Sequence, residues 1–150
     1  MIGNPKIIRA SEEQIDSLVP LFDGYRQFYG QDSDPEGARA FLTERLGTSE
    51  SVILLALNEG QGCGFTQLYP AFSSVAMRPI WILNDLFVAP DSRRLGVGRC
   101  LLRRASDFAT EQRAKRLVLC TAVDNRTAQL LYEDMGWVRD SAFQHYQFEL

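Results

Sequence analysis

Apolar and polar residues alternate along the chain in two rhythms, which predict strands and helices in succession. Short apolar runs bounded by turn residues predict strands, and they lie at 6–10, 51–57, 63–70, 80–88 and 116–122. Apolar residues three and four positions apart predict amphipathic helices, and they lie at 11–24, 34–46, 96–110 and 124–136. The turn residues at 58–62 predict that the second and third strands form a hairpin.

Polar residues at the predicted helix starts support these boundaries. Ser11 is followed three residues later by Gln14, which is the spacing of a capping box. Asp34 directly precedes Pro35, and proline is favoured in the first turn of a helix. Gly24 is expected to loosen the end of the first helix, because glycine is a poor helix former.

The remaining segments complete the predicted architecture. Residues 71–79 read as a connecting loop, and 137–150 alternate well enough to predict one or two final strands. Asp124 or Asn125 would cap the last helix, and Gly136 would end it. The order is then β-α-α-β-β-β-α-β-α-β-β. We therefore predict one α/β domain over 1–150, with a mixed central sheet of six to seven strands flanked by about four helices.

Composition and charge exclude several classes of protein. The 150 residues are 45% hydrophobic and 23% charged, which is typical of one globular domain. No run of 18 apolar residues predicts a membrane span, and the N-terminus lacks the apolar core of a signal peptide. The net charge of −3 disfavours nucleic acid as a partner. Three widely spaced cysteines predict free, buried thiols in a reducing cytoplasm and no metal site.

The segment after the fourth strand has the composition of an anion site. Two arginines, Arg93 and Arg94, precede Gly96 and Gly98 at the start of a helix. The first N–H groups of a helix have no partner within it, and small glycines let a phosphate approach them. Gly98 is not followed by the Lys-Ser/Thr pair of a P-loop, and the third glycine of a dinucleotide fingerprint is missing. Glycines that only permit tight strand–helix packing remain the alternative.

Two motifs together resemble the GNAT superfamily of acetyl-CoA-dependent N-acetyltransferases. The first is the run Arg93-Arg94-Leu95-Gly96-Val97-Gly98, which fits the family pattern Arg/Gln-x-x-Gly-x-Gly/Ala. The second combines Asn125, Ala128, Leu131, Tyr132 and the "MGW" of residues 135–137. The stretches "LNDLFVAPDSRRLGVG" and "YRQFYG" look closest to the yeast histone/polyamine and spermidine/spermine acetyltransferases.

The resemblance implies how acetyl-CoA, the co-substrate, would be held. The backbone of Arg94, Leu95, Gly96, Val97, Gly98 and Arg99 would cradle its pyrophosphate, with Arg93 opening the loop. Leu86, Phe87 and Val88 would run beside the pantetheine arm. A β-bulge near Phe87 would direct a backbone N–H at the thioester oxygen. Asn125 would contact the CoA side, and Tyr132 is the candidate general acid for the departing thiolate.

The general base and the acceptor site are less specified by the sequence. Some relatives carry a glutamate where this chain has Asn84, which cannot act as a base. Asp85 is the candidate to bind the cationic acceptor or to deprotonate it through water; a plain structural polar pair and a water chain remain alternatives. Tyr25 and Tyr29 are candidates to hold an ammonium group by cation–π contact, or are packing residues.

The resemblance implies direct transfer of acetyl to a primary amine. The acceptor would be a small polyamine-like or amino-acid-like amine, or a lysine side chain. The alternative is a non-catalytic acyl-CoA-binding or regulatory domain that keeps the loop. A homodimer through the terminal segment 143–150 is expected, because relatives often pair there and its apolar edge suits strand pairing.

Overall fold

The computed structural model describes residues 3–150, which divide into two compact units. The first unit extends to Leu119 and the second is Cys120–Leu150. The first unit contains a five-stranded sheet in the order β1-β2-β3-β4-β5. Its strands are β1 (Lys6–Arg9), β2 (Val52–Asn58), β3 (Gln61–Ser73), β4 (Arg78–Val88) and β5 (Leu117–Val118). Neighbours from β1 to β4 are antiparallel, whereas β5 is parallel to β4.

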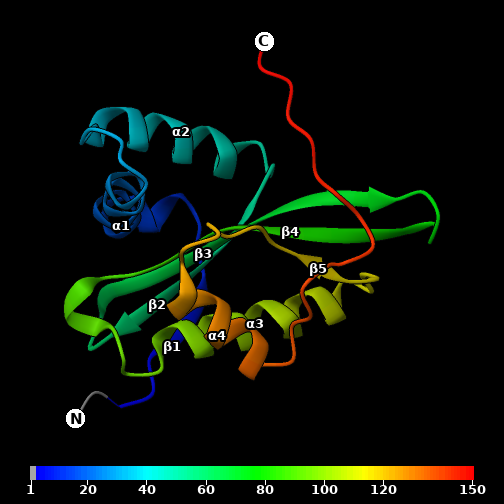
Figure 1. Ribbon diagram of the computed structural model, residues 1–150. Helices are drawn as coiled ribbons and strands as arrows, with labels where there is room; N and C mark the ends of the chain where they lie inside the picture. The colour runs from blue at the N-terminus through cyan, green and yellow to red at the C-terminus, as the bar shows by residue number, and fades with distance from the viewer. Residues whose placement is uncertain (1–2) are drawn as a thin grey trace. The chain divides into compact units, whose positions relative to one another are not determined.

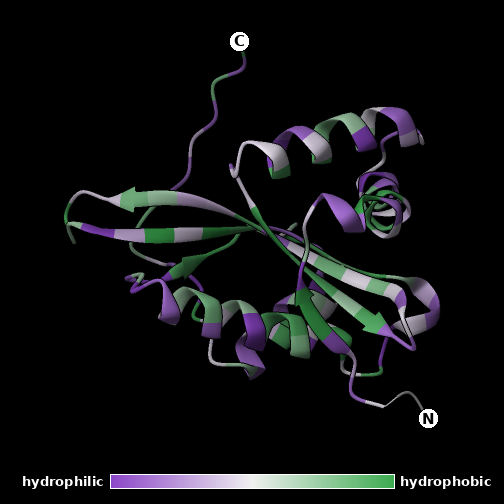
Figure 2. Cartoon of the chain, turned by 180° about the vertical axis from the view of Figure 1, so that it is seen from behind, coloured by the Kyte–Doolittle hydropathy of each residue, from purple (hydrophilic) through white to green (hydrophobic). Residues whose placement is uncertain are grey.

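Helices cover both faces of this sheet (Figure 1). The helices α1 (Ile15–Phe28) and α2 (Pro35–Gly47) lie on one face, and α3 (Val97–Glu111) lies on the other. Two short 3-10 helices, η1 (Glu12–Gln14) and η2 (Pro90–Ser92), precede α1 and α3. Figure 2 shows hydrophobic residues along the strands between these helices, where the core lies. The buried residues between α1, α2 and the sheet include Leu18, Leu42, Ile53 and Phe65.

The predicted caps are confirmed. Ser11 and Gln14 form a complete capping box, with the Gln14 side chain accepting from the Ser11 N–H at 2.7 Å. Asp34 caps α2 by accepting from the N–H of Gly37 at 2.9 Å. Gly24, in contrast, does not end α1, which continues to Phe28. Glycine keeps its backbone N–H and carbonyl, so the hydrogen bonds of the helix continue through this position.

The second unit contains one helix, α4 (Arg126–Asp134), among its described residues. Asn125 caps α4 by accepting from the N–H of Ala128 at 3.4 Å, and Gly136 follows its end with a positive φ of 90°. Residues 137–150 form neither helix nor strand. The final strands predicted there are therefore wrong: alternation favours a strand only where a neighbouring strand receives its hydrogen bonds.

Three other predictions about the strands differ from the structure. The described residues form five strands, so the expected six to seven are not seen. The strand expected over 116–122 is reduced to Leu117–Val118. The loop expected over 71–79 is shorter, because β3 and β4 continue to Ser73 and from Arg78. The extra residues of β3 and β4 form a two-stranded hairpin that is exposed on both sides. Neither side has to be apolar, so the alternation of apolar and polar residues that marks a strand is weak there.

Candidate functional site

The glycine loop has two residues in the left-handed conformation. Arg94 has a φ of +62° and Gly96 a φ of +83°. Gly96 is also the N-cap of α3, and its carbonyl accepts the first helical bond from Cys100 at 3.0 Å. Left-handed residues placed this way turn successive N–H groups toward one concave side. Together with the start of a 15-residue helix, they form a site suited to a phosphate group.

The Arg93 side chain turns back onto β4 and fixes the start of the loop. Its Nε donates to the carbonyl of Val88 at 2.9 Å. Its guanidinium lies 5.4 Å from the centre of the Phe87 ring, which is cation–π contact. Arg93 therefore ties the loop to the strand and brings its charge beside that loop.

Gly64 on β3 lets α3 begin close to the sheet. A Cβ at Gly64 would lie 2.9 Å from the carbonyl oxygen of Phe87 and 3.2 Å from a methyl of Val97. Val97, the first residue of α3, is buried against this surface. Because Gly64 has no side chain, the N-terminus of α3 can pack close to the strands.

A β-bulge interrupts β4 beside its polar residues. Gln67 pairs with Asp85, but the next residue, Leu68, pairs with Leu83. Asn84 is therefore the extra residue, and both Asn84 and Asp85 stand opposite Gln67. An extra residue reverses the alternation of faces beyond it, so the two halves of β4 present different side chains to each face of the sheet.

The bulge was expected near Phe87, and this position is wrong, because Phe87 stands in the regular ladder beyond it. The N–H of Ala89 donates to the carbonyl of Cys63 at 2.9 Å. Hydrogen-bonded pairs recur every second residue in an antiparallel ladder, so the Phe87 N–H is directed at β3. The N–H groups of Leu86 and Val88 are directed at the opposite edge of β4.

That opposite edge of β4 is paired over only a short length. In the first unit, β5 pairs with Trp81 and Ile82 of β4 and with no described residue beyond them. The ladder between these two parallel strands thus has two residue pairs. Leu86 to Val88 follow the paired residues on β4 and have no ladder partner on this edge among residues 3–119.

A cavity of about 400 Å³ lies between α1, α2, β3 and β4. Four aromatic side chains line it, and the Phe22 and Phe41 rings among them stack at 5.6 Å. The lining residues are Phe22, Tyr25, Arg26, Asp34, Gly37, Ala38, Phe41, Tyr69, Asn84 and Asp85. Asp85 is the most buried charged residue among them, with 2% of its surface exposed. A small molecule in this cavity would meet aromatic rings and one buried carboxylate.

Two amides hold the Asp85 carboxylate. Gln67 Nε2 donates to Oδ2 at 2.5 Å, and Asn84 Nδ2 donates to Oδ1 at 2.7 Å. Burial raises the pKa of Asp85 above its ordinary value, while these hydrogen bonds oppose the rise. Among the described residues, no cationic side chain forms an ion pair with Asp85. The site therefore has a desolvated carboxylate without a fixed counter-charge.

Three tyrosines surround this carboxylate. The Tyr25 hydroxyl donates to the carbonyl of Asn84 at 3.3 Å, and its ring meets Tyr29 edge-on at 5.1 Å. Burial, followed by the nearby Asp85 charge, raises the pKa of Tyr25 and Tyr29. The same two causes raise the pKa of Tyr69 to about 12. Tyr29 is half exposed and is not among the described residues that line the cavity.

Asp23 anchors the turn that leads to the cavity wall. Its carboxylate accepts from Ser33 Oγ and from the N–H of Asp34, both at 2.7 Å, and from Gln27 Nε2 at 3.1 Å. The Ser33 and Asp34 hydrogen bonds lower the pKa of Asp23. Arg26, on the cavity wall, donates to the carbonyl of Asp32 in the same turn at 3.3 Å. The turn is thus held by α1.

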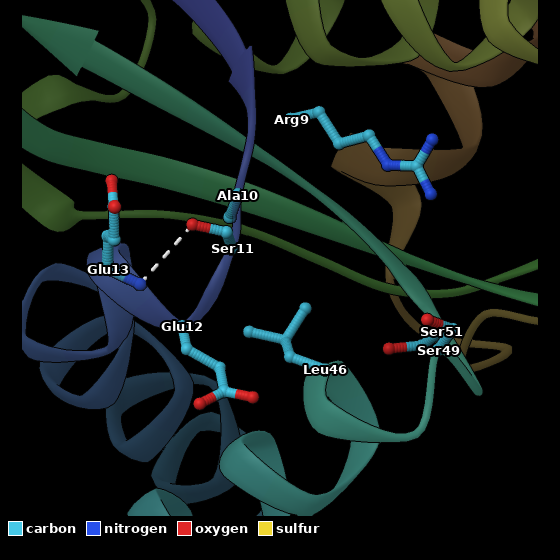
Figure 3. A pocket seen from close by; sticks show the side chains of 8 residues that line it. All are labelled: Arg9, Ala10, Ser11, Glu12, Glu13, Leu46, Ser49 and Ser51. Carbon is cyan, nitrogen blue, oxygen red and sulfur yellow. Dashed lines mark hydrogen bonds between the residues drawn. The ribbon is translucent and has the colours of Figure 1, made fainter.

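A second cavity, of about 330 Å³, lies where β1 meets η1 and the end of α2 (Figure 3). Its lining is Arg9, Ala10, Ser11, Glu12, Glu13, Leu46, Ser49 and Ser51. Figure 3 shows the Ser11 hydroxyl accepting from the Glu13 N–H, at 3.3 Å, which is a helix-capping contact. None of the predicted site residues lies in this cavity.

The second unit carries the remaining predicted residues. Asn125 uses its side-chain carbonyl to cap α4, as described above. Tyr132 lies on α4, half-buried, with its ring 6.0 Å from that of Trp137. Of the cysteines, Cys63 is buried and Cys120 is exposed, so the expectation of buried thiols is wrong for Cys120.

Over residues 3–150, no three His, Cys, Asp or Glu side chains gather closely enough to hold a metal ion. Over the same residues, no helix is both long and apolar enough to cross a lipid bilayer.

The sequence missed three residues of the site. Gln67 and Tyr69 lie on β3, two residues apart, and so share one face with the cavity. Phe41 reaches the cavity from α2. One signal was available: Gln67 is a polar residue inside an otherwise apolar strand, "CGFTQLYP".

Comparison with known proteins gives a consistent result. Residues 18–137 match the profile of the family described as "Acetyltransferase (GNAT) family". The uncharacterized N-acetyltransferase YhfO of Bacillus subtilis (strain 168) is 51% identical over 93% of this chain and 94% of that protein. A probable acetyltransferase of Haemophilus influenzae is 37% identical over 75% of this chain and 78% of that protein.

Solved structures agree. The crystal structure of a probable acetyltransferase is 45% identical, with a TM-score of 0.92 over 97% of both chains. An aminoglycoside N-acetyltransferase, solved in complex with CoA, has a TM-score of 0.81 over 99% of this chain and 97% of that one. At 17% identity, the second likeness concerns the fold alone.

Proposed function

The chain belongs to the GNAT family of acetyltransferases, and from this premise we propose that it transfers acetyl from acetyl-CoA to a primary amine by direct attack. The neutral amine nitrogen forms a bond to the thioester carbonyl carbon, and the C–S bond breaks. The amine loses one proton to a base, and the CoA sulfur gains one. The products are an N-acetyl amine and free CoA.

The loop of residues 93–99 is proposed to bind the pyrophosphate. Support comes from the left-handed Arg94 and Gly96 and from the N-terminus of α3 behind them. The residues from Arg94 to Arg99 would present backbone N–H groups, and Arg93 would add charge from its position over Phe87. Phosphate oxygens are the ligands that such an N–H cluster prefers.

Leu86, Phe87 and Val88 are proposed to run beside the pantetheine arm. The resemblance placed the donor for the thioester oxygen near Phe87. Ladder alternation supports its neighbours instead, because the N–H groups of Leu86 and Val88 are directed at the edge where β5 ends. One of these two would stabilise the oxyanion of the tetrahedral intermediate.

The single observation that carries the acceptor proposal is the buried Asp85 carboxylate in an aromatic cavity. An ammonium group supplies the missing counter-charge and fits against the faces of Tyr25 and Tyr69. Asp85 would attract the cation and take its proton, directly or through water; Asn84 and Tyr29 would support it. The acceptor would be a small polyamine-like or amino-acid-like amine or a lysine side chain.

Two residues of the second unit have proposed roles, which rest on the family resemblance alone. Tyr132 would protonate the CoA thiolate, and Asn125 would contact the CoA side of the site. We also propose a homodimer in the cytoplasm. Exposed apolar residues in the last eight positions, among them Phe143, Tyr146 and Phe148, support self-association.

A thiol-release assay with acetyl-CoA and a panel of amines tests this function, alongside calorimetry with CoA. Turnover with one class of amine is expected. CoA binding with no turnover on any amine would favour the alternative, a non-catalytic acyl-CoA-binding domain. Tyr132→Phe should lower kcat by about 100-fold and leave CoA affinity within about twofold. A large loss of CoA affinity would instead contradict the acid role.

A further inference from the structure

We propose that Gln67 is a positioning residue for Asp85, holding its carboxylate in the one orientation that faces the amine. This inference rests on the proposed function, in which Asp85 receives the acceptor. Gln67 itself does not line the cavity among the described residues, so it would act only through Asp85. No part of the family resemblance concerns this residue.

The burial of Gln67 has no evident purpose for stability alone. Its side chain is 0% exposed in the centre of the sheet, between Thr66 and Leu68, which are also fully buried. A buried amide must find hydrogen bonds or cost free energy, and an apolar residue of similar size would pack there without that cost. A buried glutamine paired with a buried aspartate is therefore better explained by what the pair does.

The Gln67 amide is oriented with its donor toward Asp85. Gln67 Nε2 faces Asp85 Oδ2 at 2.5 Å, while Gln67 Oε1 has no hydrogen-bond partner. A buried oxygen without a hydrogen-bond partner costs free energy. Turning the amide over would place Oε1 against Oδ2, two acceptors, unless Asp85 carried a proton. The amide thus presents a donor to the Asp85 carboxyl group, and this contact favours the charged form of Asp85.

The bulge explains how one glutamine serves this carboxylate. Asn84 and Asp85 both stand opposite Gln67, so the carboxylate lies between the two amides. Each amide holds a different oxygen, which fixes the plane of the carboxyl group. The residues facing Asp85 from the surrounding elements are Tyr25 of α1, Tyr29 directly after α1, and Tyr69 of β3. Arg26 and Asp34 are the other charged residues of the cavity.

Gln67→Met tests the proposal, because it keeps the side-chain length and removes the amide. We expect kcat/KM for the amine to fall about ten- to 100-fold, with the acidic limb of its pH profile moved to higher pH. Affinity for CoA should stay within about twofold, since that site lies elsewhere. Loss of the Gln67 hydrogen bond removes an interaction that favours the charged carboxylate.

Thr66→Val is the matched control. It also removes a buried hydrogen bond from β3, but one at 2.7 Å to the main-chain carbonyl of Asp85. Thr66→Val should leave the pH profile where it is, whatever either variant does to the melting temperature. A profile that moves equally in both variants, or in neither, overturns the positioning role. Should Gln67→Met fail to fold, Gln67→Asn, whose shorter amide cannot reach Oδ2, replaces it.

A second measurement separates this proposal from the function on which it rests. The carboxyl carbon of Asp85 is titrated by NMR and assigned by its absence in Asp85→Asn. Its midpoint should rise in Gln67→Met, and an unmoved midpoint rejects the role of Gln67 even without turnover. If Asp85→Asn keeps full turnover, the proposed function of Asp85 fails. If Asp85→Asn abolishes turnover and Gln67→Met leaves the profile unmoved, only the role of Gln67 fails.

Discussion

Replacing Asp23 by alanine should destabilise the fold and loosen the acceptor cavity. Asp23 is 7% exposed and accepts two short hydrogen bonds, from Ser33 and from the N–H of Asp34, and a longer one from Gln27. Together they hold the turn between α1 and α2 that ends at Asp34, a cavity residue. The substitution leaves the N–H of Asp34 and the hydroxyl of Ser33 without their partner.

The magnitude follows from those bonds. A hydrogen bond to a charged group contributes about 1.5–3 kcal/mol, and two short ones at a site near the surface suggest a total loss of about 3 kcal/mol. In a domain of this size that corresponds to a melting point lower by ~6–12 °C. Asp23→Asn keeps one acceptor oxygen and should lose less, about 1 kcal/mol.

Stability should also depend on pH in a defined direction. The pKa of Asp23 in the folded protein lies below its ordinary value of 3.8. The stabilisation is therefore complete at neutral pH and is lost as pH falls below 3.8 through the folded pKa. The difference between the wild type and Asp23→Asn should be full at pH 7 and should narrow at acidic pH.

Urea unfolding followed by circular dichroism measures these differences, with Asp16→Ala as the control. Asp16 also lies on α1 and contacts Arg39 at 2.7 Å, but its side chain is 88% exposed. Exposed ion pairs contribute about 0–1 kcal/mol, so this control should unfold near the wild type. Equal midpoints for Asp23→Ala and Asp16→Ala would refute the reasoning. The acceptor KM should rise only in Asp23→Ala.

Two further predictions concern the strands of the site. Gly64→Ala should cost about 1–3 kcal/mol, because its Cβ would meet the Phe87 carbonyl oxygen at 2.9 Å. Gly62→Ala, whose nearest neighbour is a Leu21 methyl at 3.3 Å, should cost less, and equal melting points would contradict this. Asp85→Asn should be ~0.5–2 kcal/mol more stable than the wild type at pH 7 and inactive. The pKa of Asp85 is raised in the folded protein, so its charge destabilises the fold only above about pH 3.8. The extra stability of Asp85→Asn should therefore vanish in acid. Extra stability that stays constant with pH would contradict this prediction.

The sequence predicted those parts of the fold that depend on local pattern. Capping residues such as Ser11 and Asp34 act within four residues, and the structure confirms both. The glycine loop was also predicted, because its residues are consecutive. The final strands were not predictable, because pairing depends on a partner strand that the alternation of 137–150 does not identify.

The acceptor cavity was only half predictable, for a related reason. Tyr25 and Asp85 stood out as chemistry-bearing residues, but their contact depends on how α1 packs over β4. Gln67 and Tyr69 belong to β3, and only the register of β3 against β4 brings them beside Asp85. Long-range register is not encoded in any single window of the sequence.

One extra residue in β4 connects the core to the proposed chemistry. In an uninterrupted strand, Trp81 and Asp85 would share a face, since they are four residues apart. Trp81 instead packs edge-on against Phe108 of α3 at 4.9 Å, while Asp85 faces Tyr25 of α1. The bulge at Asn84 makes both possible, because it reverses the faces between them. β4 can therefore supply apolar packing to α3 along its first half and, along its second, present a buried carboxylate to the acceptor cavity.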